Sequence, residues 1–194
     1  MVYYSLFNKD RKMLLSTKIP VTSPRMIHDF MMTENHFIIP DSPMELRPDI
    51  CVKKGKFVFQ FIGEKTSRYG IMKRRCQNPD QVQWFEVPGH MVFHYVNAWE
   101  EKAANGDDII RCFGCVQQDI DIDFTEEHPF LKGKFSPTFT KFIFNLTTGK
   151  VEMTKLFEDM ACEFPVVDQD NIGYETQFAY LSEFQTTLPG DKTG

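Results

Sequence analysis

Apolar and polar residues alternate along much of this 194-residue chain, and this alternation constrains the fold more than any other feature. Successive side chains of a β-strand point to opposite faces, so an alternating run predicts a strand with one buried face. The clearest cases are Phe57, Phe59 and Phe61 on one face of Lys56–Ile62, and Phe142 and Phe144 on one face of Thr140–Asn145. Many short strands of this kind predict an all-β sandwich, barrel or propeller.

Short polar segments rich in Gly, Pro, Asn and Asp separate the alternating runs. One of them joins Lys141–Leu146 to Val151–Leu156, and this arrangement predicts a β-hairpin. The only helix we expect is one or two turns over Ala98–Asn105, ended by Gly106 as a C-cap. We expect residues 1–194 to form a single domain segment.

Composition excludes several classes of protein. The net charge is -5 with no basic stripe, which argues against nucleic acid as a partner. No apolar run approaches the roughly 20 residues of a membrane-spanning helix, and no targeting segment opens the chain. Five scattered cysteines indicate a reducing compartment rather than a disulfide framework. Nineteen phenylalanines indicate an aromatic core or a pocket for a long apolar ligand.

Two histidines lie in strand-like apolar runs beside acidic residues. His28 precedes Asp29, and His94 follows Phe93. A histidine in such a run is more often a hydrogen-bonded core residue than a metal ligand. Neutral imidazole nevertheless suits iron, zinc and copper when a carboxylate or carbonyl holds its other ring nitrogen. Glu163 is a further carboxylate at the end of a predicted strand.

Two other patterns mimic metal sites and are interpreted otherwise. Cys112 and Cys115 have C-x-x-C spacing, but a zinc ribbon needs a second such pair, and the sequence has none. His90 and His94 are four residues apart, but Met91 stands where the metalloprotease motif needs glutamate. We expect His90 to be a loop residue.

Three motifs occur in order along the chain. They comprise His28, Asp29, Phe30, Thr33, Glu34 and Asn35 (H-D-F-x-x-T-E-N), Phe93, His94, Asn97, Ala98, Trp99 and Glu100 (F-H-x-x-N-A-W-E), and Glu163, Phe164 and Pro165 (E-F-P). In order and approximate spacing they resemble motifs of the carotenoid cleavage oxygenases. That family includes the lignostilbene dioxygenases and the retinal pigment epithelium isomerase. Val166 and Val167 depart from the family, whose members often carry a basic residue soon after E-F-P.

The resemblance implies a seven-bladed β-propeller with an iron ion on its axis, to which this chain would contribute roughly three to four blades from the central part. In the family four histidines bind Fe(II), and three glutamates orient some of them. By resemblance His28 matches the second ligand and His94 the third. Glu163 matches a glutamate bonded to the nitrogen of His94 that faces away from iron. The remaining ligands have no counterpart and would lie outside this chain.

By the same resemblance, the protein would be a non-haem Fe(II) dioxygenase. It would cleave a conjugated C=C bond of a carotenoid, apocarotenoid or stilbene-like substrate with O₂, giving carbonyl products. With only two imidazoles, the isolated chain is expected to be inactive. Trp99 and the phenylalanines are candidate pocket walls, with core packing as the alternative. We expect a cytoplasmic or plastid location and leave open a peripheral membrane contact.

The alternative hypothesis is a non-catalytic all-β module or a degenerate relative of the family. Such a protein would bind an apolar ligand or a protein partner without metal. Stoichiometric iron that is lost in His94→Ala would favour the enzyme, and iron-independent ligand binding would favour the alternative. The family resemblance does not distinguish cleavage from isomerisation, because one fold and one metal site can serve several reactions.

Overall fold

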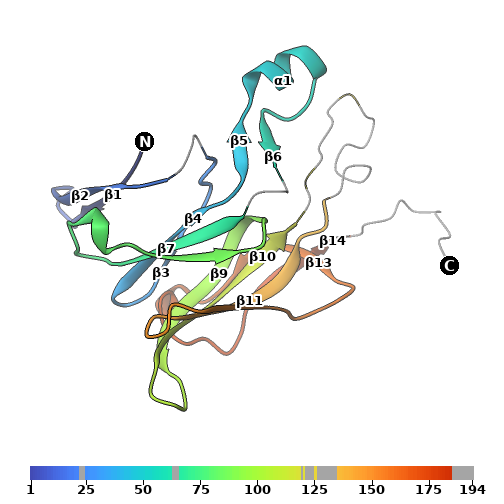
Figure 1. Cartoon of the computed structure of the whole chain (residues 1–194). Helices are drawn as coiled ribbons and strands as arrows, with labels where there is room; N and C mark the ends of the chain where they lie inside the picture. The colour runs from blue at the N-terminus through green and yellow to red at the C-terminus, as the bar shows by residue number, and fades with distance from the viewer. Residues whose placement is uncertain (22–24, 63–65, 119, 121–124, 126–134, 185–194) are drawn as a thin grey trace.

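The computed structural model describes residues 1–21, 25–62, 66–118, 120, 125 and 135–184, which form β-strands and short helical segments (Figure 1). The all-β prediction is confirmed. The strands assemble into a six-stranded sheet, a four-stranded sheet and two two-stranded sheets. The helical segments are α1 (Pro48–Lys54) and two 3-10 turns, η1 (Pro79–Gln81) and η2 (Gln169–Asn171).

The four-stranded sheet lies between two apolar layers. Its order is β3 (Met31–Met32), β4 (His36–Asp41), β7 (Ser67–Lys73) and β8 (Gln83–Val87), with every neighbouring pair antiparallel. Its central strands are buried on both faces. Ile38 and Ile71 belong to one apolar cluster, whereas Phe37 and Met72 belong to another. Two-sided burial explains why these strands are almost continuously apolar in the sequence.

The six-stranded sheet carries the candidate site residues His94 and Glu163. Its order is β14 (Tyr180–Phe184), β13 (Ala161–Val166), β11 (Thr138–Asn145), β10 (Asp108–Gln117) and β9 (Met91–Lys102), and β12 (Val151–Lys155) also pairs with β11. The predicted β11–β12 hairpin is confirmed. Phe142 and Phe144 lie on one buried face, as their spacing predicted, and their rings are nearly parallel.

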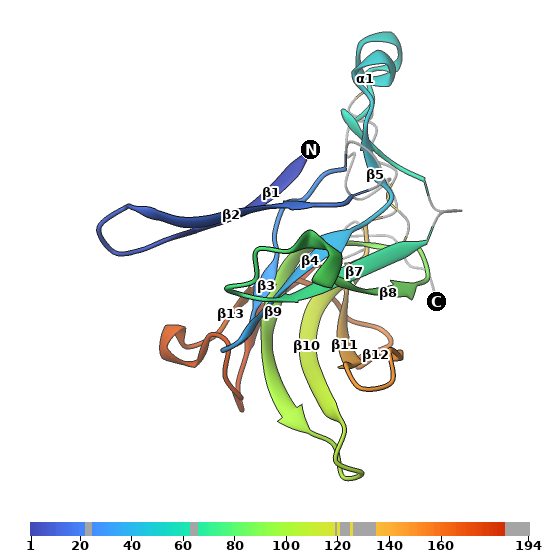
Figure 2. The same ribbon diagram turned by 60° about the vertical axis from the view of Figure 1, so that its left-hand side comes forward.

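The main core lies between the two large sheets, which pack face to face (Figure 2). Tyr69 and Phe85 from the four-stranded sheet meet Phe144 from the six-stranded sheet, with ring centroids 5.2 Å apart in both pairs. The hairpin of β1 (Val2–Phe7) and β2 (Met13–Ile19) covers the other face of the four-stranded sheet. The chain therefore stacks successive antiparallel sheets as layers.

A small arm of β5 (Met44–Leu46), α1 and β6 (Phe59–Phe61) extends from these layers (Figure 1). The strand predicted over Lys56–Ile62 is shorter than expected. The sequence also gave no sign of α1 through apolar periodicity, because α1 buries none of its residues. The sequence signals for this helix were Pro48 at its start and Gly55 after its end, where the backbone is left-handed.

Two further expectations about local structure are wrong. Ala98–Asn105 does not form a helix, because β9 continues to Lys102 and pairs with β10 before the turn at Gly106. Tertiary pairing overrides the helical preference of the alanines there. His28 lies outside any strand, in the segment before β3. It is an exposed residue of a connecting segment rather than part of a buried run.

Candidate functional site

His94 lies where the pairing of β9 with β10 is irregular. The register shifts between Phe113 and Gly114 and again between Gly114 and Val116, and His94 lies opposite the second shift. An extra residue in one strand bends that strand and re-aims its side chains. The His94 side chain is 34% exposed, whereas half of the residues of β9 are buried. The irregular pairing and the partial exposure of His94 therefore occur at the same place in β9.

Glu163 on β13 holds the Nδ1 nitrogen of His94. Its Oε2 lies 2.7 Å from Nδ1 and also accepts the backbone N–H of Phe164 at 3.0 Å. Burial raises the pKa of Glu163, although hydrogen bonds from His94 and Phe164 act in the opposite direction. A carboxylate that accepts the Nδ1 proton fixes the neutral tautomer of His94, whose Nε2 lone pair is then available.

His28 meets His94 from the segment before β3. The two ring centroids are 5.1 Å apart, and the ring planes are perpendicular, at 89°. Two imidazoles that bind one metal at about 2.1 Å and subtend roughly 90–110° hold their centroids roughly 4.5–5.5 Å apart. We refer to His28 and His94 as the histidine pair. Its spacing fits two neighbouring ligands of one metal ion.

The histidine pair could hold part of a metal site but not a complete one. Within the described residues, no group of three or more His, Cys, Asp or Glu side chains could hold a metal by itself. Two neutral imidazoles, one of them held by Glu163, suit iron or another late first-row metal. Cys112 and Cys115 are buried in the core, and burial raises the pKa of both thiols.

Four phenylalanines close a circuit of aromatic rings with the histidine pair, which we call the aromatic circuit. Every neighbouring pair of rings has a spacing typical of aromatic contacts. The centroid distances are 5.1 Å for His28–His94, 5.3 Å for His94–Phe164, 5.9 Å for Phe164–Phe184, 6.2 Å for Phe184–Phe135, 6.1 Å for Phe135–Phe93 and 5.7 Å for Phe93–His28. The histidine pair therefore borders an apolar, aromatic surface.

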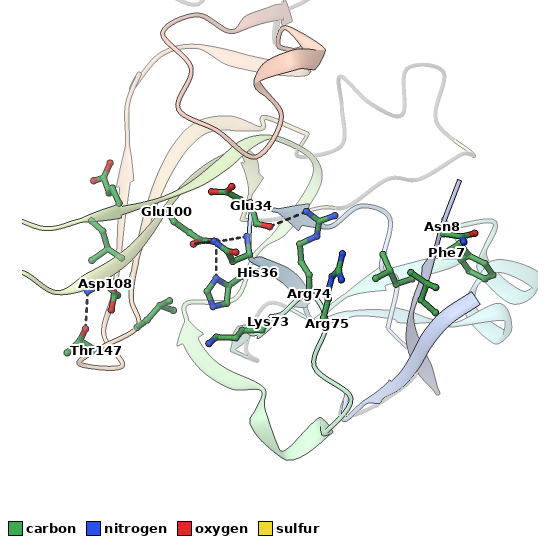
Figure 3. A pocket seen from close by; sticks show the side chains of 16 residues that line it. Phe7, Asn8, Glu34, His36, Lys73, Arg74, Arg75, Glu100, Asp108 and Thr147 are labelled. Atoms are coloured by element: carbon green, nitrogen blue, oxygen red, sulfur yellow. Dashed lines mark hydrogen bonds and ion pairs between the residues drawn. The ribbon is translucent and has the colours of Figure 1, made fainter. Parts of the chain in front are cut away.

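Other motif residues form a second cluster, the Glu100 clamp, which consists of Thr33, Asn35, His36 and Glu100. Glu100 accepts a hydrogen bond from the Thr33 hydroxyl. It also accepts from the backbone N–H and Nδ2 of Asn35 at 3.0 Å each, and from His36 Nδ1 at 2.9 Å (Figure 3). Burial raises the pKa of Glu100, but these bonds outweigh it and lower the pKa to about 2. The clamp joins the β3–β4 turn to β9.

A cavity of about 1100 Å³ opens beside the Glu100 clamp (Figure 3). Its walls include Leu6, Leu14, Glu34, Lys73, Arg75 and Asp108, so they carry charges of both signs. Neither member of the histidine pair lines this cavity. The cavity is therefore separate from the candidate metal site.

Asn97 is a motif residue that fastens the loop after β13 to β9. Its Nδ2 donates to the carbonyl oxygens of Asn171 and Tyr174, at 2.9 Å each. Its Oδ1 accepts the backbone N–H of Gly173 at 2.9 Å. The loop follows the strand that carries Glu163, so Asn97 secures the connection on one side of that residue.

Comparison with known proteins assigns the family. The family model described as "Retinal pigment epithelial membrane protein" matches residues 1–192. The chain belongs to the carotenoid cleavage oxygenase family. Sequence relatives in this family include a carotenoid 9,10(9′,10′)-cleavage dioxygenase of Pisum sativum, 31% identical over 180 residues. That match covers 92% of this chain and 32% of the relative. A chloroplastic 9-cis-epoxycarotenoid dioxygenase of Arabidopsis thaliana is 27% identical over 92% of this chain and 30% of its own length.

Solved structures of family members share the fold. Cobalt-substituted apocarotenoid oxygenase of Synechocystis superposes with a TM-score of 0.76 at 20% identity, over 94% of this chain and 38% of that one. The lignostilbene dioxygenase of Pseudomonas brassicacearum gives a TM-score of 0.71 at 23% identity, over 96% and 38%. The prediction that this chain forms part of a β-propeller is confirmed. It spans about a third of the length of its relatives.

Two residues of the aromatic circuit were not predicted from the sequence. Phe135 and Phe184 join the aromatic circuit from positions far from either histidine in the sequence. Trp99, a candidate pocket wall, is buried and stacks on Phe113. Across the part of the chain that the structure describes, no helix is long and apolar enough to cross a bilayer.

Proposed function

We propose that this chain is the central segment of a single propeller domain in a non-haem Fe(II) dioxygenase. The enzyme would cleave a conjugated C=C bond of a long apolar substrate with O₂, giving two carbonyl products. The observation that carries the proposal is the perpendicular histidine pair, 5.1 Å between centroids, with Glu163 2.7 Å from Nδ1 of His94. The names of the relatives, which are carotenoid and lignostilbene dioxygenases, support this class of reaction.

His28 and His94 would each hold the iron through one neutral imidazole. The bound iron would supply the activation of O₂, because an all-neutral ligand set leaves its charge uncompensated and positions open. Glu163 acts on His94 and not on the metal: it keeps the Nδ1 proton in place and raises the basicity of Nε2. The other ligands would come from parts of the propeller outside these residues.

The aromatic circuit supports a long apolar substrate such as a carotenoid, an apocarotenoid or a stilbene. Phe93 and Phe164 contact the imidazoles directly, so an apolar molecule at the histidine pair would lie against aromatic rings. Binding such a molecule depends mostly on the apolar area that it buries. A chloroplastic relative is compatible with the predicted plastid location, which stays a prediction together with the peripheral membrane contact.

The test is the iron content of the native polypeptide that carries these residues, in wild type, His94→Ala and His36→Ala. His36 is a matched control because its Nδ1 also bonds a carboxylate, at 2.9 Å, but no second histidine faces it among the ring contacts of the described residues. We expect His94→Ala to lose iron and cleavage of an apocarotenoid, and His36→Ala to retain both. Stoichiometric iron in His94→Ala would refute the proposal.

The isolated 194-residue chain should not cleave substrate. Two imidazoles hold iron weakly when the remaining ligands are missing. Robust cleavage of an apocarotenoid by residues 1–194 alone would contradict this expectation. Iron-independent binding of the same compound by the native polypeptide would instead favour the non-catalytic, ligand-binding alternative.

A further inference from the structure

Asp29 forms a direct bridge between the neighbours of the two candidate ligands. Its Oδ2 accepts the backbone N–H of Tyr95 at 3.0 Å, and its Oδ1 accepts the backbone N–H of Phe30 at 2.8 Å. Asp29 follows His28 in the chain, and Tyr95 follows His94. The carboxylate therefore connects the two histidine-bearing backbones within one residue of each imidazole.

This bridge meets a physical need of β9. Of the strands in its sheet, β9 comes last in the order, so amides that point away from β10 have no strand partner within that sheet. A buried backbone N–H without an acceptor is costly, and Tyr95 is buried. The carboxylate of Asp29 takes the place of the missing strand at this amide.

The Tyr95 end of the bridge is fixed in the core. Its hydroxyl donates to the Tyr69 hydroxyl at 3.2 Å, and the Tyr69 hydroxyl lies 2.7 Å from Nε2 of buried His90. Gly114 leaves room for the ring, since a Cβ there would lie 3.0 Å from Tyr95. The amide that Asp29 accepts is therefore held by a packed, hydrogen-bonded side chain.

The His28 end of the bridge is loosely held by comparison. His28 is exposed, lies outside any strand and makes no side-chain hydrogen bond within the described residues. Its ring contacts are with Phe93 and His94. The position of its backbone thus depends strongly on the neighbouring residue, Asp29.

We propose that Asp29 is a positioning residue, which ties the His28 segment to β9 and so sets the spacing of the histidine pair. Both of its oxygens accept backbone hydrogen bonds, so its role is to orient the ligands and not to bind the metal. The inference rests on the proposed function for its chemical purpose. The spacing itself can be tested without any metal.

The first test is metal-free. In the native polypeptide with labelled histidines, a nuclear Overhauser contact between the rings of His28 and His94 is expected in wild type and lost in Asp29→Ala. The Tyr95 amide should also exchange faster with solvent in that variant. Asp29→Asn should be intermediate, because its amide keeps one acceptor oxygen but turns a donor toward a second backbone N–H. A contact that persists in Asp29→Ala would overturn the proposal.

The second test uses Co(II) as a spectroscopic probe of the same variants. We expect Asp29→Ala to weaken Co(II) binding at least about tenfold, as loss of an outer-shell partner typically does, and to change the visible absorption of the bound ion. Asp107→Ala is the matched control. Its carboxylate accepts from Asn105 and Asn145 at 2.9 and 2.8 Å, at the far end of β9 and β10.

The two tests separate the two ideas. Asp107→Ala should lower stability without moving the Co(II) spectrum, and equal spectral changes in both variants would reduce Asp29 to a general structural role. If wild type binds no Co(II) but the ring contact depends on Asp29, the positioning role stands and the proposed function fails. If Co(II) binds and Asp29→Ala leaves its affinity and spectrum unchanged, the positioning role fails alone.

Discussion

Two histidine–glutamate pairs in this chain share the same contact, a carboxylate at the Nδ1 nitrogen, but differ in their surroundings. His94 Nδ1 lies 2.7 Å from Glu163, and His36 Nδ1 lies 2.9 Å from Glu100. Glu100 receives donors on both of its oxygens, from Thr33 and Asn35 as well as from His36. Glu163 receives its two donors on Oε2, whereas its buried Oε1 has no partner among the described residues.

From this difference we expect Glu100 to stabilise the fold and Glu163 to act mainly on its neighbour, His94. The donors around Glu100 favour its ionised form and bring its pKa to about 2. Burial around Glu163 opposes ionisation and raises its pKa. A buried acceptor without a hydrogen-bond partner costs stability, so we expect Glu163 to contribute less to the stability of the fold than Glu100 does. His94 in turn faces a second imidazole, whereas His36 belongs to the clamp and lines the mixed-charge cavity.

The largest effect is expected from Glu163→Gln on metal binding. Loss of the negative charge behind His94 should weaken Co(II) or Fe(II) binding by about 10- to 100-fold, because the imidazole loses basicity and a fixed tautomer. The free energy of unfolding should stay the same or rise slightly, since a buried charge disappears. Metal titration and urea unfolding of the native polypeptide measure the two quantities. Unchanged affinity together with lost stability would make Glu163 equivalent to Glu100.

Glu100→Gln should give the opposite pattern. Glutamine cannot accept all four hydrogen bonds of the clamp, and its amide would face the donors of Asn35. Because hydrogen bonds to charged groups are worth more than neutral ones but this site is partly exposed, we expect a loss of about 1–2 kcal/mol in unfolding free energy. Metal affinity should change less than threefold, a smaller effect than at Glu163. Comparable loss of metal binding in the two variants would break the distinction.

The clamp also predicts how stability depends on pH. Glu100 has a folded pKa of about 2, below its ordinary 4.5, so its contribution is full above pH 4.5 and is lost as the pH falls toward 2. After allowance for solvent screening we expect a loss of about 1 kcal/mol. Urea midpoints measured from pH 5 to 3 should fall in wild type and fall less in Glu100→Gln. Parallel curves would show that other carboxyls dominate.

Buried His90 adds a separate window at higher pH. Burial lowers its pKa to about 4 from 6.5, partly offset by the hydrogen bond to the Pro88 carbonyl. The unfolded chain therefore binds this proton first, and stability should fall as the pH drops from 6.5 toward 4. Glu100→Gln should retain this upper window, which would show that the window does not come from Glu100. Stability that is constant from pH 7 to 5 would contradict the assignment to His90.

The sequence predicted the alternating strands, the β11–β12 hairpin and the set of His28, His94 and Glu163. The structure brings those three side chains together, while their role in binding iron stays a prediction. The motifs did not reveal that Glu100 belongs to a clamp. A glutamate bonded to a histidine occurs both in the Glu100 clamp and at the histidine pair, and the sequence does not distinguish the two.

Long-range pairing explains what the sequence could not reveal. Phe184 lies on β14, and Phe135 lies shortly before β11. The order of these strands in the sheet brings both to the aromatic circuit, and no local sequence pattern encodes that order. His90 was expected in a loop, and it does lie outside the strands, but tertiary packing buries its ring against Tyr69. Asp29 likewise gains its role from the amide of a strand far away in the chain.

The smallest effect concerns Phe164, which has no counterpart beside Glu100. Its backbone lies in the left-handed region at φ 53°, and its ring contacts His94 although its side chain is 58% exposed. Phe164→Gly should lose that contact but relieve roughly 1 kcal/mol of backbone strain, so the net change in unfolding free energy should be small. Phe164→Ala loses the ring and keeps the strain, and should be about 1 kcal/mol less stable than Phe164→Gly. Urea unfolding compares the two variants. Equal unfolding free energies would mean that the left-handed backbone at residue 164 is not strained.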